Sequence, residues 1–295
     1  MDIELEQLFD KQSGVATSGQ ILVRMSRRKF EAAVNCGELE RIWQGIYCRG
    51  EPTDELRLAG LDLSSGATVP VCLGTAAEVY GFNTERIPDL HVLNPPGGQI
   101  RCADGLVVHR REGAPLVLVN GRPVTAPAWT AVEAARALRR PRALATLDAA
   151  LRSGTCGRVE LWQAALQQAG RRGIVAVREL IPLADGLAES PMESEARLAM
   201  IDGGLPMPQL QYEVIDGNGD LRRLDFAWPD QRVAVEYDGV DWHSEPDVLR
   251  RDRRRRAALE AVGWVVISIV FEDVRYRAWE FVARIDGQLR HTRAA

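Results

Sequence analysis

The stretch RRLDFAWPDQRVAVEYDGVDWH, residues 222–243, decides which fold the sequence indicates. Two short apolar runs flank a turn at Pro229-Asp230, which predicts a hairpin of two strands. Asp225 lies on the first strand, and Glu236 and Asp238 lie on the second. Carboxylates in an apolar strand repel each other and lose hydration, unless a cation, a proton or an arginine lies between them. The stretch therefore indicates either a metal site or carboxylates paired within the protein.

The sequence around this hairpin predicts a third unit over residues 186–295. Ser190 is a good N-cap for a helix that starts at Pro191 and ends near two glycines. Three strands follow, then an arginine-rich helix, the buried strand WVVISIVF and a last amphipathic helix, VRYRAWEFVARIDGQL. The order αβββαβα is the core order of restriction-endonuclease-like nucleases.

The acidic residues of this unit form the candidate catalytic and metal site. Glu193 comes from the first helix, whereas Asp225 and Glu236 come from two adjacent strands. Asp238, two residues after Glu236, shares its face. Oxygen ligands of this kind suit Mg²⁺ or Mn²⁺, with Asp225 and Glu236 as the main ligands and Glu193 and Asp238 as further ones. His243 would serve as general base for a metal-activated water.

The alternative interpretation pairs these carboxylates within the protein. Asp225 or Asp238 would cap a turn, and nearby arginines would pair with the other acids; the candidates are Arg222, Arg223 and Arg232. The arginine run at 250–256 is also open to two interpretations. The helix would carry a stripe of arginines formed by Arg251, Arg254 and Arg255. This stripe would either follow a phosphate backbone or form a solvated face.

Residues 1–50 predict a helical unit that ends in a hairpin. Ser26 is a good N-cap for the third helix, and Gly37 is a good stop. LERIWQGIYCRG reads as two strands around Gln44-Gly45. This is the plan of a winged helix-turn-helix domain, in which the start of the recognition helix faces the major groove.

The third helix starts with Arg27, Arg28 and Lys29, which oppose its macrodipole. DNA phosphate would compensate, so we expect these three residues to contact DNA. Weaker candidates on the preceding helix and the wing are Arg24, Arg41 and Arg49. A small helical domain with a solvated basic face is the alternative. The net charge of −4 does not decide between them, because a local basic patch can bind phosphate on an acidic protein.

Residues 51–185 predict a mixed α/β middle region. The runs VPVCLG, LHVLNP and GLVVHRR read as strands, and WTAVEAARAL and RALATLDAALRSG read as helices. This region has no phosphate loop, nucleophile elbow or metal-ligand pair, and His91 and His109 read as structural residues.

The five scattered cysteines of the whole chain argue against a disulfide framework or a zinc site. Because no apolar run is long enough to span a bilayer and no signal-peptide core is present, we expect a cytoplasmic protein without a membrane partner. The fold class is therefore α+β and multidomain.

Two resemblances add to this interpretation. SPMESEARL, LDFAWPDQRVAVEYDGVDWH and RRDRRRRAALEAVGW resemble domains related to the very-short-patch-repair endonucleases of the PD-(D/E)xK superfamily. That superfamily has a lysine two positions after the acid of its third motif, where this chain has Asp238; His243 would substitute. Residues in the first two parts of the chain resemble the AbiEi family of antitoxins. The stretches that carry this resemblance are GVATSGQILVRMSRRKFEAAVNCGELERIWQGIYCRG, LGTAAEVYGF, LHVLNP, GLVVHRR and RPVTAPAWTAVEAARAL. The whole chain resembles actinobacterial proteins that fuse both parts.

The AbiEi resemblance implies a sequence-specific antitoxin that represses its own toxin–antitoxin operon. Its partners would be double-stranded DNA, as inverted repeats in its own promoter, and a nucleotidyltransferase-like toxin encoded next door. The nuclease resemblance implies the alternative, a Mg²⁺-dependent DNA endonuclease delivered by the winged helix. A third possibility is an inactive nuclease fold that holds a protein partner.

Overall fold

The computed structural model describes residues 3–85, 88–95, 97–110, 113–239 and 246–294. By its internal contacts the chain divides into two compact units. Unit 1 comprises Met1–Val79 and Arg86–Ala126, and unit 2 comprises Tyr80–Glu85 and Pro127–Ala295. The three-part division of the sequence stays a prediction. Within the described ranges, no helix combines the length and apolar character needed to cross a bilayer.

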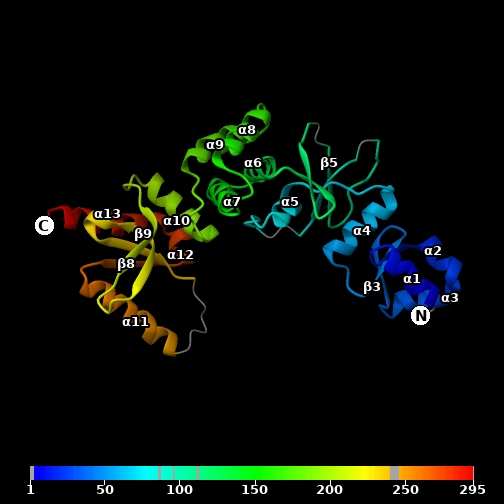
Figure 1. Cartoon of the computed structure of the whole chain (residues 1–295), viewed down its shortest axis with the longest axis horizontal. Helices are drawn as coiled ribbons and strands as arrows, with labels where there is room; N and C mark the ends of the chain where they lie inside the picture. The colour runs from blue at the N-terminus through cyan, green and yellow to red at the C-terminus, as the bar shows by residue number, and fades with distance from the viewer. Residues whose placement is uncertain (1–2, 86–87, 96, 111–112, 240–245, 295) are drawn as a thin grey trace. The chain divides into compact units, whose positions relative to one another are not determined.

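The first part of unit 1 consists of three helices and a three-stranded sheet (Figure 1). The elements are α1 (Ile3–Lys11), β1 (Val15–Thr17), α2 (Ser18–Arg24), α3 (Arg27–Asn35), β2 (Leu39–Trp43) and β3 (Ile46–Arg49). The sheet order is β1-β3-β2, and all pairs are antiparallel. Leu5 and Phe9 of α1, Ile21 of α2, Ala33 of α3 and Leu39 of β2 form one core. The predicted caps and hairpin are confirmed, whereas β1 was not expected.

The remainder of unit 1 contains α4 (Asp54–Ser65), α5 (Leu73–Val79), β4 (Leu90–Leu93), β5 (Leu106–His109), β6 (Leu116–Val119) and β7 (Arg122–Thr125). The pair β4–β5 is parallel, whereas β6–β7 is an antiparallel hairpin. Val71 forms single bridges to Val92 and Val124 and so lies between the two pairs. The prediction of a strand over VPVCLG is wrong, because only Val71 makes strand bridges and α5 already begins at Leu73.

Unit 2 begins with a group of helices and ends with a sheet that has helices on both faces. The helices before the sheet are α6 (Pro127–Ala137), α7 (Arg140–Arg152), α8 (Arg158–Gln167), α9 (Ile174–Leu180) and α10 (Pro191–Asp202), with a 3₁₀ turn at Ile181–Leu183. Helix α10 starts as predicted, with the Ser190 side chain accepting a hydrogen bond from the backbone N–H of Glu193.

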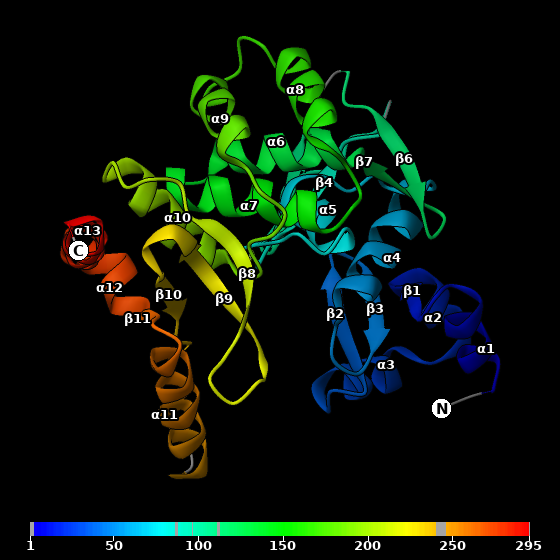
Figure 2. The ribbon, with the colours of Figure 1, turned by 60° about the vertical axis from the view of Figure 1, so that its left-hand side comes forward.

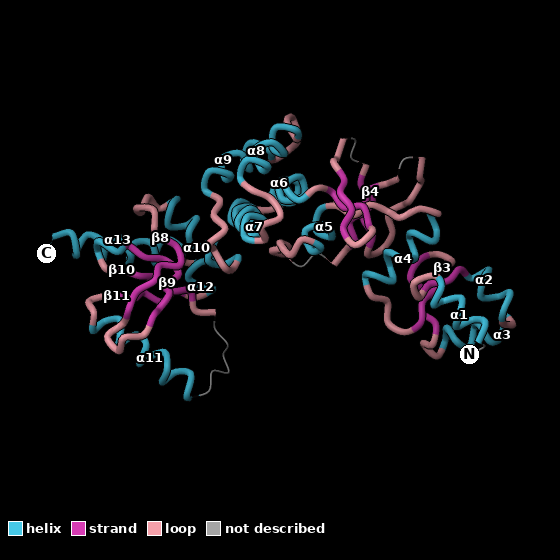
Figure 3. Tube along the Cα trace, viewed as in Figure 1, coloured by secondary structure: helices cyan, strands magenta, loops and turns pink. Residues whose placement is uncertain are grey.

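The sheet of unit 2 is built from β8 (Gln209–Ile215), β9 (Leu221–Trp228), β10 (Val233–Tyr237) and β11 (Val265–Ile269), in the order β11-β10-β9-β8. Helix α11 (Pro246–Ala261) connects β10 to the parallel strand β11. Val233 and Val235 pack with α10, α12 (Phe271–Tyr276) and α13 (Ala278–Ala294) on one face. Ala234, between them, packs with Leu259 of α11 on the other face. Figures 2 and 3 show α11 apart from the other three helices, as this alternation requires.

The element order αβββαβα of residues 186–295 agrees with the sequence prediction up to the last helix. The prediction of one helix over VRYRAWEFVARIDGQL is wrong, because α12 ends at Tyr276 and α13 begins at Ala278. The break lies at Arg277, whose φ of −132° and ψ of 35° are not helical. The start of α12 is also earlier than predicted, at Phe271, where Asp273 accepts a hydrogen bond from the backbone N–H of Val270.

Candidate functional site

Helix α3 presents a cluster of cations at its N-terminus. The Ser26 side chain accepts a hydrogen bond from the backbone N–H of Lys29 and so fixes the first turn. Arg27, Arg28 and Lys29 are all exposed, and no acidic residue lies in that turn. Arg27 pairs with Glu31 at 3.1 Å, but both side chains are largely solvated. The cluster therefore faces solvent at the positive end of a helix dipole, where it attracts anions.

The weaker DNA-binding candidates have different surroundings. Arg41 is exposed on β2 of the hairpin. Arg24 donates to the backbone oxygen of Gln20 at 3.0 Å. Arg49 pairs with Asp10 at 3.1 Å, and its guanidinium lies 5.5 Å from the centre of the Phe9 ring. Arg49 therefore contacts α1 through its side chain, whereas Arg41 extends the exposed positive surface onto the hairpin.

Three largely buried carboxylates of unit 2 lie near one another, and they come from α10 and from the central strands β9 and β10. The register pairs Val235 with Phe226, so that Asp225 and Glu236 are neighbours on β9 and β10. Glu236 follows Val235, whose side chain packs on the opposite core, and therefore lies on the same face as Ala234, which packs against α11. Asp225 lies across from Glu236 and is near enough to Arg255 of α11 for the guanidinium to lower its pKa. On the neighbouring strand β8, Gln211 lies opposite Asp225, because the residues on either side of Gln211 pair with the residues on either side of Asp225.

Each carboxylate has a partner within the protein. One Asp225 oxygen accepts from the backbone N–H of Tyr237 at 2.9 Å. Glu236 Oε1 lies 2.6 Å from an Nη atom of Arg255 on α11. Glu193 Oε2 accepts from Gln211 Nε2 at 3.1 Å, and also from the backbone N–H of Glu189 at 2.9 Å. The same Gln211 side chain hydrogen-bonds to Asp225, so that it links two of the acids.

Burial raises the pKa of Glu193, Asp225 and Glu236 above the usual carboxyl value. Asp225 raises the pKa of Glu193 and of Glu236 further, because its carboxylate lies near both. The Arg255 guanidinium opposes this effect at Glu236 and Asp225. A further cation in this site would therefore be stabilised by the carboxylates.

The alternative interpretation named the wrong arginines. Arg222 pairs with Asp216 and Asp220, and Arg223 pairs with Glu189. Arg232 donates to the backbone oxygen of Val262. The partner of Glu236 is instead Arg255, which the sequence placed only in a stripe on α11. Neither that role nor the link through Gln211 was predicted, because both depend on how α11 and β8 lie against the central strands.

Two of the predicted site residues lie apart from this cluster. Asp238 is exposed, and its backbone N–H donates a hydrogen bond to the backbone oxygen of Ile269 at 2.9 Å. His243 lies outside the described residues. Among the residues that are described, no group of three or more His, Cys, Asp or Glu side chains is arranged to hold a metal ion. The Mg²⁺ site stays a prediction.

Comparisons with known proteins place the chain among relatives. The AbiEi antitoxin C-terminal domain family matches residues 69–183. The chain is 53% identical over 271 residues to uncharacterized protein Rv2248 of Mycobacterium tuberculosis strain ATCC 25618/H37Rv. It is equally similar to uncharacterized protein MT2308 of strain CDC 1551/Oshkosh. Each alignment covers 92% of this chain and 100% of the relative.

Proposed function

The chain belongs to one family with the two mycobacterial proteins and carries the AbiEi antitoxin C-terminal domain, and from this premise we propose that it is a DNA-binding antitoxin that represses its own operon. In this proposal residues 1–50 act as a winged helix-turn-helix domain that binds inverted repeats in the promoter. The toxin partner would be a nucleotidyltransferase-like protein encoded in the same operon. The exposed cation cluster on α3 is the observation that carries the proposal.

The electrostatics of α3 support a phosphate ligand. Arg28 and Lys29 make no ion pair within the described residues, and the pair between Arg27 and Glu31 is too exposed to neutralise the turn. Three cations at the positive end of a helix dipole destabilise the isolated helix. DNA phosphates would neutralise them and release counterions, which makes binding favourable and strongly dependent on salt.

The hairpin β2–β3 is suited to the role of the wing. Its turn at Gln44-Gly45 joins two antiparallel strands, and Gly45 has a φ of +74° that favours glycine. The backbone oxygen of Gly45 accepts from the N–H of Ser18 at 2.8 Å, which holds the turn against the start of α2. Arg41 lies on the exposed part of the same hairpin. In the proposal it contacts the DNA backbone beside the groove that α3 enters.

The test is a titration of the full chain against a labelled fragment of its own upstream region. The Arg27→Ala/Arg28→Ala variant should abolish promoter binding at physiological salt. The matched control is Arg101→Ala/Arg172→Ala, which removes two other exposed arginines and the same total charge. Equal affinity of the wild type and the α3 variant would refute the proposal. Equal losses in both variants would reduce it to nonspecific charge attraction.

The buried carboxylates favour a second candidate function, a Mg²⁺-dependent DNA endonuclease. Oxygen ligands from Glu193, Asp225 and Glu236 suit Mg²⁺, and burial raises the pKa of all three, so that a cation among them would stabilise their charged forms. The contact between Arg255 and Glu236 opposes metal entry, so that Arg255 would have to move. A bound Mg²⁺ would polarise a DNA phosphate and activate water, and the proposed general base is His243.

One gel separates the two candidates. The protein is incubated with its upstream fragment and with mismatched duplexes, in EDTA and in Mg²⁺ or Mn²⁺. A mobility shift without cleavage in every lane supports the repressor alone. Cleavage that requires metal and disappears in Asp225→Ala supports the endonuclease. A stable complex with the neighbouring gene product would add the third possibility, a nuclease fold that holds a partner.

A further inference from the structure

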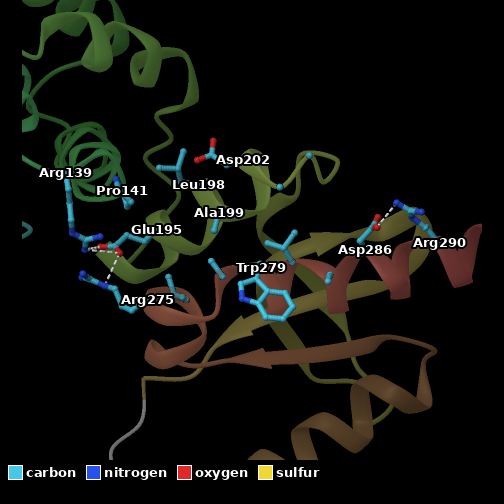
Figure 4. Close-up of a pocket in the computed structure, with 16 residues that line it drawn as sticks. Arg139, Pro141, Glu195, Leu198, Ala199, Asp202, Arg275, Trp279, Asp286 and Arg290 are labelled. Carbon is cyan, nitrogen blue, oxygen red and sulfur yellow. Dashed lines mark hydrogen bonds and ion pairs between the residues drawn. The ribbon is translucent and has the colours of Figure 1, made fainter.

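Unit 2 contains a cavity of about 660 Å³ that no part of the proposed function uses. It lies between the C-terminal half of α10, the N-terminus of α7 and the helices α12 and α13 (Figure 4). Its floor is apolar, from Leu198, Ala199, Val274, Ala278, Val282 and Ala283. The volume is within the usual range for small-molecule sites, roughly 300–1,000 Å³.

One end of the cavity carries an excess of positive charge. Arg139, Arg142 and Arg275 all approach the buried carboxylate of Glu195, at 3.0, 3.0 and 3.1 Å. Arg142 also lies 3.3 Å from Glu85. Three guanidinium groups thus meet two carboxylates, which leaves one positive charge unbalanced in a half-buried place.

The electrostatic crowding at this end favours an anion. Burial lowers the pKa of Arg275; the Glu195 carboxylate opposes that shift, and the neighbouring cations Arg139 and Arg142 add to it. Arg139 and Arg275 line the cavity, whereas Arg142 does not, and the Nε atoms of Arg142 and Arg275 are buried against Glu195. Arg139 is the more exposed of the two lining arginines, at 43%, and shares one carboxylate with two other guanidinium groups. Arginine donors that are not satisfied by a single carboxylate are well suited to phosphate oxygens.

The middle of the cavity is lined by an aromatic side chain that little else contacts. Trp279 is 73% exposed, and Figure 4 shows its ring between the Arg139–Glu195–Arg275 cluster and the far pair of Asp286 with Arg290. The lining acids at the far side are already neutralised, because Asp286 pairs with Arg290 at 2.7 Å and Asp202 pairs with Arg140. An exposed tryptophan beside an apolar floor offers a stacking surface for a flat ring.

From these observations we propose that the cavity binds a nucleotide, with its phosphates on Arg139 and Arg275 and its base against Trp279. The two chemistries lie at neighbouring places in one cavity, as a ligand with a charged end and an aromatic end requires. A free nucleoside triphosphate and the phosphorylated end of a DNA strand share this chemistry. This site goes beyond the antitoxin proposal and does not involve α3.

The test is isothermal titration calorimetry on the full chain. ATP should bind saturably, and adenosine or inorganic triphosphate alone should bind at least tenfold more weakly, because each offers only one end of the ligand. Arg139→Ala and Trp279→Ala should each weaken ATP binding by at least fivefold, the lower range of a single stacking or charge-assisted contact. Both side chains are substantially exposed, so the fold should survive, and Arg139→Lys should keep part of the affinity.

Two control variants match the test variants in chemistry and exposure. Arg277 is 49% exposed, compared with 43% for Arg139, and pairs with a single carboxylate. Tyr276 is 74% exposed, and neither Arg277 nor Tyr276 lines the cavity. Arg277→Ala and Tyr276→Ala should change the affinity for ATP by less than twofold.

A 5′-phosphorylated oligonucleotide distinguishes the two sources of the ligand. If it binds with the same dependence on Arg139 and Trp279 while ATP does not, the ligand is a DNA terminus and the proposed chemistry stands. If inorganic triphosphate binds as well as ATP, the cavity is a simple anion site and the nucleotide proposal is overturned. Absence of saturable binding by every probe, or binding that neither variant weakens, overturns it as well.

Discussion

Replacing Arg197 with methionine should destabilise unit 2 strongly, because the change leaves a buried charge without its partner. Arg197 on α10 lies 2.7 Å from Asp148 on α7, and the two side chains are 3% and 0% exposed. The guanidinium also donates to the backbone oxygen of Leu183 at 2.6 Å. Removing one partner of a buried pair costs about 3–5 kcal/mol. For a unit of this size, that corresponds to a fall in Tm of roughly 6–20 °C.

The pH dependence of this loss identifies its cause. Burial raises the pKa of Asp148, and Arg197 and the backbone N–H of Asp185 oppose that shift. Without Arg197 the pKa of Asp148 rises further, so between the unfolded pKa and the raised folded pKa the folded variant holds a proton that the unfolded chain has lost. The variant should therefore lose most stability above the raised pKa, and the loss should shrink as the pH falls toward the unfolded value of about 4.

The assay combines differential scanning calorimetry with hydrogen exchange of the full chain, which reports α7 and α10 separately from unit 1. Arg290→Met is the control, because Arg290 is 77% exposed in a helical pair that contributes about 0.3–0.5 kcal/mol. The Asp148→Asn/Arg197→Met double variant should recover part of the loss. If Arg197→Met behaves like Arg290→Met, or if its loss is the same at pH 5 and pH 8, the buried-charge argument is refuted.

Two further predictions concern the carboxylate site and the backbone. Arg255→Ala should tighten Mn²⁺ binding, measured by calorimetry, because it removes the guanidinium partner of Glu236. The control is Arg251→Ala on the same helix. If both variants bind Mn²⁺ with the affinity of the wild type, a metal site that includes Glu236 is contradicted. Gly173→Ala should lower the free energy of unfolding by about 1–3 kcal/mol, because Gly173 has a φ of +83° and a Cβ would lie 2.7 Å from the backbone oxygen of Arg136. Gly170→Ala has a similar φ with open space around it, so denaturant titration should show a smaller loss there, and equal losses would refute the steric contribution.

Local signals in the sequence predicted most helices and strands. Ser26 and Ser190 were identified as N-caps, and each side chain accepts the expected hydrogen bond. The hairpin around Gln44-Gly45 was predicted from turn chemistry. Signals of this kind act within a few residues, so the sequence displays them directly. The strand β1 was missed because it has three residues and depends on pairing with β3.

The candidate site was predicted less completely, since its geometry depends on contacts between distant elements. The sequence placed Glu193, Asp225 and Glu236 in one unit, and the structure brings them near each other. It did not identify Gln211 as the link between two of them, because nothing in the local pattern of β8 distinguishes this glutamine. The pairing of Arg255 with Glu236 joins residues 19 apart and required the position of α11.

Helix α10 explains why the nucleotide cavity was not visible beside the carboxylate site, although both use acids from the same short motif. Glu193 and Glu195 are two residues apart, which on a helix is about 200° of rotation, so they point to opposite sides. Glu193 meets Gln211 of the sheet, whereas Glu195 meets Arg139, Arg142 and Arg275. The spacing of Glu195, Leu198, Ala199 and Asp202 follows i, i+3, i+4 and i+7, which is one face of a helix, and that face lines the cavity. Helical periodicity alone therefore places Glu195 on a different surface of α10 from Glu193.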